Sequence, residues 1–232
     1  MNVVSIFAHQ DDEMRCLGTM LKCKIRGDSL AFVTLTDGSI GFEGIKSEEG
    51  AKIRFEEMTN LAGSIKAEYI SLNEKDSFLY DSKDIRIKLI EVIRKTRAEL
   101  IFTHYCSDYN NDHVTVFELV RQCCMHAPLP YIKTTSQPLK EHPAVFMVEP
   151  HGLINFPATH FVDISEYEEQ KIELLKNHVS QEKAMKDAVK AGFETLVKIP
   201  DSYWGQKVCC QYAECFIALP SRGSVKAYNV LP

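Results

Sequence analysis

The sequence predicts an α/β protein with a mainly parallel sheet flanked by helices. Three observations lead to this prediction. Short apolar runs alternate with longer amphipathic segments through the first half of the chain, as in strand–helix–strand units. Residues 2–8 are an almost unbroken apolar run, which is typical of a central parallel strand buried on both faces. Polar residues capable of chemistry follow the predicted strands, where ligands of such sheets bind.

The elements of the first half follow from periodicity and turn residues. The first strand is followed by a predicted helix at 11–26, whose apolar residues share one face and which Gly27–Asp28 ends. A second strand at 29–36 stops at Asp37–Gly38. The remaining predictions are a glycine-containing loop at 38–44, helices at 47–62 and 83–97, and strands at 68–72 and 99–105.

The second half is read more coarsely. The patterns predict a helix at 116–124, a proline-rich loop at 127–143, strands at 146–150 and 160–165, and one amphipathic helix over 166–190. The last forty residues, which contain Pro200, Gly205, Pro220 and Gly223, are left unassigned. We expect residues 1–232 to form a single domain, because the length suits one sizeable core.

Composition narrows the class of protein. The net charge of −5 and the lack of a Lys/Arg run argue against a nucleic-acid partner. No stretch approaches the ~20 apolar residues of a membrane span, and residues 1–13 have no basic region of a secretory signal, so we expect a cytoplasmic protein. The eight cysteines show no CxxC spacing and are interpreted mainly as small buried hydrophobes. The oligomeric state is left open, a homo-oligomer included.

The segment AHQDDE (8–13) places one imidazole and three carboxylates in five consecutive positions after the first strand. Adjacent carboxylates repel one another and lose hydration when partly buried, and a divalent cation compensates both effects. His9 and Asp12 are three residues apart, so a turn can direct both at one centre, while Asp11 faces the substrate as a base. The alternative is a helix N-terminus enriched in acids with no function attached.

A second cluster, DYNNDH (108–113), follows the predicted strand at 99–105. His113 is a candidate third metal ligand from across the sheet. Asp112 is a candidate hydrogen-bond partner that holds an imidazole or an ammonium group in place. A histidine at a helix start usually has no such role. Two clusters at the same edge of one sheet favour a metal site.

These motifs resemble those of the LmbE/PIG-L family of zinc-dependent N-acetylglucosaminyl deacetylases. AHQDDE is similar to the family's AHPDDE, and DYNNDH to its second motif, which usually contains HPDH. Further matches are Gly18–Thr19, TDG at 36–38, Arg54 with Glu57, Asp76 with Leu79, VDIS at 162–165 and HVSQ at 178–181. The resemblance covers most of the chain and implies a Rossmann-like fold.

Carried over residue by residue, the resemblance implies that His9, Asp12 and His113 bind zinc. It implies that Asp11 is the general base that takes a proton from water activated by the metal, which then attacks the acetyl carbonyl. It also makes Arg54 and Asp76 sugar-contacting residues; without it they would be a surface arginine and a loop aspartate. Other histidines, His178 and His104 among them, are left outside the site.

Two positions depart from the family pattern. Gln10 replaces a proline and removes no functional group. Asn110 stands where the second motif usually has a histidine that stabilises the oxyanion or protonates the leaving group. Its amide can donate a hydrogen bond but cannot deliver a proton, so Asp11 returns the proton, another residue substitutes, or activity is weak.

Several alternatives stay open at this point. One is a catalytically impaired homologue that keeps zinc and sugar binding, and another is a zinc amidase acting on a non-sugar amide, such as an acylated antibiotic intermediate or a peptide-like substrate. A nucleotide-binding Rossmann protein is disfavoured, because HQDDE, rather than GxGxxG, follows the first strand. The sequence does not identify the sugar or distinguish Zn²⁺ from Fe²⁺.

Overall fold

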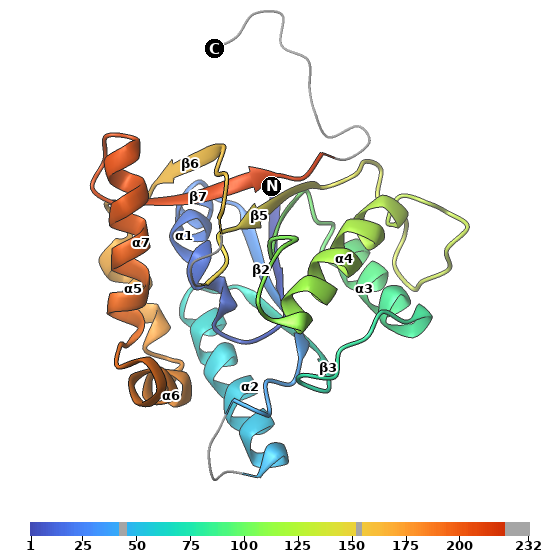
Figure 1. The fold of residues 1–232 in the computed structure, drawn as a ribbon. Coiled ribbons are helices and arrows are strands. Elements are labelled where there is room, and N and C mark those ends of the chain that lie inside the picture. Colours follow the sequence, from blue (N-terminus) through green and yellow to red (C-terminus); the bar gives the residue numbers. More distant parts are fainter. Residues whose placement is uncertain (42–45, 152–154, 221–232) are drawn as a thin grey trace, which may run out of the picture.

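A computed structural model describes residues 1–41, 46–151 and 155–220 (Figure 1). The strands are β1 (Asn2–Phe7), β2 (Ser29–Thr36), β3 (Glu68–Glu74), β4 (Leu100–Thr103), β5 (Ala144–Val148), β6 (His160–Asp163) and β7 (Ala213–Ala218). The helices are η1 (Asp12–Arg15, a short 3-10 helix), α1 (Leu17–Ile25), α2 (Ser47–Ser64), α3 (Lys83–Lys95), α4 (Asn111–His126), α5 (Glu168–Leu175), α6 (Val179–Val189) and α7 (Phe193–Lys207). None of the described helices is long and apolar enough to span a membrane.

The strands form one seven-stranded sheet in the order β3-β2-β1-β4-β5-β7-β6. Strands β1 to β5 pair in parallel, whereas β7 runs antiparallel to both β5 and β6. The predicted mainly parallel α/β fold is therefore confirmed. The chain order reverses between β1 and β4, and the crevice at the carboxyl ends of two such strands is the usual ligand site of an open α/β sheet.

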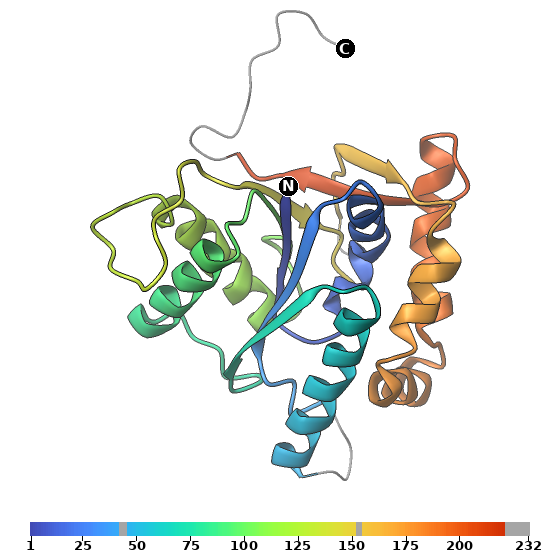
Figure 2. The ribbon, with the colours of Figure 1, turned by 180° about the vertical axis from the view of Figure 1, so that it is seen from behind.

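Two layers of helices cover the sheet (Figures 1 and 2). Side chains of β1 alternate between the layers: Val3 and Phe7 pack with residues of α1, α2, α5 and α7, whereas Val4 and Ile6 pack with residues of α3 and α4. Because β1 is covered on both faces, most of its residues are apolar, and its interior exception, Ser5, is buried as well. This burial on both faces makes β1 a rigid support for the loop that follows it.

Three predicted helices differ clearly from their expected bounds. The helix expected at 116–124 is longer, because α4 (Asn111–His126) begins at the cap residue Asn110, ahead of the apolar pattern. The expected helix at 11–26 is a 3-10 turn followed by α1, because the backbone at Asp11 and Cys16 departs from helical geometry. The expected helix at 166–190 is two helices, α5 and α6, separated by residues 176–178. The predicted loop at 38–44 lies partly outside the described residues.

The unassigned C-terminal region contains α7 and β7. Pro200 lies inside α7, where proline usually breaks a helix, and this hid the helix from sequence patterns. Strand β7 inserts between β5 and β6, which precede it in the chain. Its neighbours are thus determined by long-range pairing rather than by local sequence.

Candidate metal centre and active site

The candidate site lies at the carboxyl ends of β1 and β4, where the strand order reverses. His9 comes two residues after β1, and His113 lies in the first turn of α4, which follows β4. The loop after β1 is anchored to the sheet, because the backbone N–H and the hydroxyl of Thr36 both donate to the carbonyl oxygen of Ala8. The sequence clusters 8–13 and 108–113 therefore meet at one edge.

The three predicted metal ligands lie together, with their donor atoms converging. His9 Nδ1 is 3.3 Å from His113 Nε2, and the Asp12 carboxylate is 3.5 Å from His9 Nδ1 and 3.4 Å from His113 Nε2. Donors bound tetrahedrally at ~2.1 Å from zinc would be about 3.4 Å apart. The spacing and the chemistry of this donor set fit a zinc ion.

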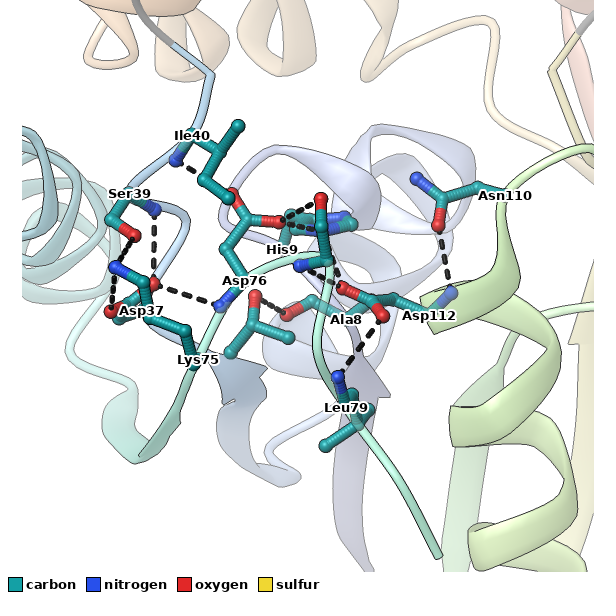
Figure 3. Close-up of polar contacts among 12 residues, drawn as sticks. Ala8, His9, Asp37, Ser39, Ile40, Lys75, Asp76, Leu79, Asn110 and Asp112 are labelled. Carbon is teal, nitrogen blue, oxygen red and sulfur yellow. Dashed lines mark hydrogen bonds and ion pairs between the residues drawn. The ribbon is translucent and has the colours of Figure 1, made fainter. Parts of the chain in front are cut away.

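Carboxylates next to the two imidazoles orient them, and Figure 3 shows the two beside His9, Asp76 and Asp112. His9 Nε2 is 3.2 Å from Asp76 and 3.6 Å from Asp112, and His113 Nδ1 is 3.0 Å from Asp108. A proton held on each of these nitrogens leaves the lone pairs of His9 Nδ1 and His113 Nε2 facing the same point. Such outer partners fix the tautomer of histidines that bind metals.

The electrostatics of the site favour a cation. Burial lowers the pKa of His9, but the surrounding carboxylates outweigh it and raise that pKa well above its ordinary value. Burial raises the pKa of Asp12, but the imidazoles of His113 and His104 hold it well below the usual range. The buried cluster therefore stabilises positive charge, whether a proton or a metal ion carries it.

Asp11 lies beside the ligands in an unusual backbone conformation, with φ 119°. Non-glycine residues seldom adopt positive φ, and such conformations cost on the order of 1–3 kcal/mol. Arg54 from α2 donates to the Asp11 carboxylate at 2.8 Å and to the carbonyl oxygen of Gln10. Burial raises the pKa of Asp11, and the Arg54 guanidinium opposes this rise.

Asn110 has a structural role that the sequence did not reveal. It is the N-cap of α4, where its Oδ1 accepts the backbone N–H of Asp112 at 2.8 Å (Figure 3). Asparagine is among the preferred residues at this position. The Asp112 carboxylate accepts the N–H of Ser77 at 2.7 Å and that of Leu79 at 3.4 Å, so it also joins α4 to the loop after β3.

The predicted sugar-contacting residues lie at the site but have protein partners. Asp76 accepts the N–H of Ile40 at 2.9 Å in addition to its contact with His9, and Arg54 is only 2% exposed. Their role toward a sugar stays a prediction. Sequence reasoning missed four residues around the site. Asp108 contacts His113, His104 contacts Asp12, Glu13 accepts the N–H of Asp11, and His178 contacts Glu13.

The fold and the site define a class of α/β protein with a candidate metal centre of two histidines and one aspartate. The family model described as GlcNAc-PI de-N-acetylase, PIG-L, matches residues 4–124, which is about half of the chain. The chain belongs to the PIG-L family, also called LmbE-like. The family prediction from the sequence motifs is therefore confirmed.

Solved structures share the fold over nearly the whole chain. The N,N'-diacetylchitobiose deacetylase from Pyrococcus horikoshii superposes with a TM-score of 0.81 at 23% identity, covering 94% of this chain and 83% of that one. The conserved protein TT1542 from Thermus thermophilus gives 0.80 at 24% identity, covering 98% and 100%. The 4-carboxy-2-hydroxymuconate hydratase from Pseudomonas putida gives 0.82 at 19% identity, covering 98% and 100%. At these identities the likeness concerns the fold.

Proposed function

We propose that the protein is a zinc-dependent deacetylase that hydrolyses the N-acetyl group of an N-acetylglucosamine-type amino sugar or its conjugate. The observation that carries the proposal is the convergence of His9, Asp12 and His113 on one point. Asp11 directly precedes the ligand Asp12, and Arg54 holds its carboxylate. Membership in the de-N-acetylase family supports the choice of reaction. A deacetylase for diacetylchitobiose shares the fold and supports an amino-sugar substrate.

The residues divide the chemistry among them. His9, Asp12 and His113 would hold the zinc ion, which would supply a Lewis acid for the acetyl carbonyl and lower the pKa of water. Asp11 accepts the proton of the attacking water, and burial, which raises its pKa, makes it a better base than an exposed aspartate. Arg54 holds the Asp11 carboxylate in place for this transfer.

Asn110 limits how the leaving amine is protonated. Its Oδ1 is engaged with the backbone of α4, which leaves the amide nitrogen as the group able to donate to the developing oxyanion. An amide cannot deliver a proton at neutral pH. Of the routes left open by the sequence, we propose that Asp11 returns the proton that it accepted, so that acetate and the free amine are released.

The test measures acetate release from a panel of free, nucleotide-linked and inositol-linked N-acetylglucosamine derivatives. Zinc-loaded wild type is compared with metal-stripped protein and with Asp11→Ala; Asp81→Ala, which removes an exposed aspartate paired with Arg86, is the matched control. We expect release that requires metal, that Asp81→Ala retains and that Asp11→Ala lowers by about 10²–10⁴-fold.

A different result would redirect the assignment. Stoichiometric zinc binding without acetate release from any sugar would refute sugar deacetylation. Release from acylated antibiotics or peptide-like amides in the same assay would then indicate an amidase for non-sugar substrates. Tight sugar binding without turnover would indicate an impaired homologue.

A further inference from the structure

The segment HVSQ (178–181) has no part in the proposed chemistry, yet it reaches the candidate site. His178 is fully buried and directly precedes α6, and its carbonyl oxygen accepts the N–H groups of Gln181 and Glu182 in the first turn. Ser180 donates through its N–H and its hydroxyl to Glu57 on α2. The segment thereby joins α6 to α2, the helix that carries Arg54.

A chain of two hydrogen bonds links His178 to the backbone of Asp11. His178 Nε2 lies 2.7 Å from Glu13 Oε1, and Glu13 Oε2 accepts the Asp11 N–H at 3.0 Å. The two side chains are 0% and 3% exposed. A buried carboxylate is costly unless it is hydrogen-bonded, so the imidazole allows Glu13 to remain in the interior and accept this N–H.

The imidazole of His178 is the donor in this chain, because a carboxylate oxygen accepts. His178 Nδ1 is buried and has no hydrogen-bond partner among the described residues. A proton there would leave an N–H group unsatisfied, whereas a bare lone pair costs less. The proton therefore lies on Nε2 and points to Glu13, which fixes the direction of the hydrogen bond.

Asp11 needs such support because its positive φ is unfavourable for a residue with a side chain. Its carboxylate is held from one side by Arg54, and its N–H from the other side by Glu13. The ligand Asp12 has a separate anchor, since its Oδ2 accepts the N–H of His9 at 2.7 Å. The loop thus holds the base and the ligand by different contacts.

We propose that Glu13 and His178 are positioning residues, which hold the backbone of Asp11 in the conformation that directs its carboxylate at the reaction centre. The inference rests on the proposed role of Asp11 as general base. Because the contact is with the Asp11 backbone and not with substrate or metal ligands, its loss lowers kcat. KM and the zinc dissociation constant stay nearly unchanged.

The experiment compares three variants of the full chain. His178→Leu keeps a similar volume but removes the donor, and His178→Gln keeps an N–H donor of similar reach. Ser180→Ala is the matched control, because it removes a contact of the same helix start with Glu57 and none with Glu13. For each protein, kcat, KM, zinc affinity by chelator competition and the melting temperature are measured, and crystal structures give φ at Asp11.

We expect His178→Leu to lower kcat at least tenfold with KM and zinc affinity within threefold of wild type, and His178→Gln to restore most of kcat. Ser180→Ala keeps wild-type kcat. In the crystal, Asp11 leaves positive φ in His178→Leu and keeps it in His178→Gln. Retention of that φ in His178→Leu would overturn the inference even if wild type released no acetate, an outcome that would separately refute the proposed function. An equal loss of kcat in His178→Leu and His178→Gln would also overturn the inference.

Discussion

The contact between Asp108 and His113 gives a quantitative prediction for metal affinity. Asp108 Oδ2 lies 3.0 Å from His113 Nδ1, and the two side chains are 1% and 5% exposed. Asp108→Ala leaves this N–H without its acceptor in a buried position. An unsatisfied buried donor costs about 1–3 kcal/mol, which corresponds to about 5–150-fold in a dissociation constant.

Zinc affinity is measured by competition with a chromophoric chelator at pH 8, where protons compete least for the imidazoles. Asp108→Ala is expected to weaken zinc binding by that factor, and Asp108→Asn by less, because its amide oxygen can still accept the hydrogen bond. Asp81→Ala, an exposed aspartate beside Arg86, is expected to bind zinc as wild type does. A dissociation constant for Asp108→Ala within twofold of wild type would refute the reasoning.

Two further predictions concern a buried charge cluster between α5, α7 and β7. Lys171 is 0% exposed and pairs with Asp201 at 2.5 Å and Glu214 at 2.9 Å, so Lys171→Met is expected to lower the free energy of unfolding by about 3–5 kcal/mol in urea titrations. Burial raises the pKa of Glu168 to about 8, although Lys171 opposes the rise. Glu168 then stays protonated in the folded protein while the unfolded chain ionises above about pH 4.5, so wild-type stability falls between pH 4.5 and 8. Glu168→Gln is expected to remove that fall, a gain of a few kcal/mol over wild type at pH 8.

Control measurements show whether the changes in the free energy of unfolding come from the buried charges themselves. Lys186→Met removes an exposed partner of Glu182 and is expected to change stability by less than about 1 kcal/mol. A loss as small as this for Lys171→Met would contradict a stabilising role for the buried lysine. Parallel stability–pH curves for wild type and Glu168→Gln would show that Glu168 is ionised in the folded protein.

Much of the fold and the core of the candidate site follow from the sequence. Apolar runs and amphipathic segments identified β1 to β4 and the helices between them, because burial on one or both faces leaves a local pattern. The family followed from two short motifs, AHQDDE and DYNNDH. Their meeting was also predictable, since the carboxyl ends of parallel strands share one edge. His9, Asp12 and His113 were accordingly chosen together, and the fold places them together.

Only the tertiary structure decided which groups form hydrogen bonds that orient the site residues. His178 reaches Glu13 across 165 positions of the chain, and the break between α5 and α6 that places it there left no local signal. Glu13 in turn accepts the N–H of Asp11, so the loop forms a 3-10 turn instead of the first turn of a long helix. Periodicity records whether a residue is buried, but not which partner it meets. The orienting contacts of the candidate active site depend on such partners.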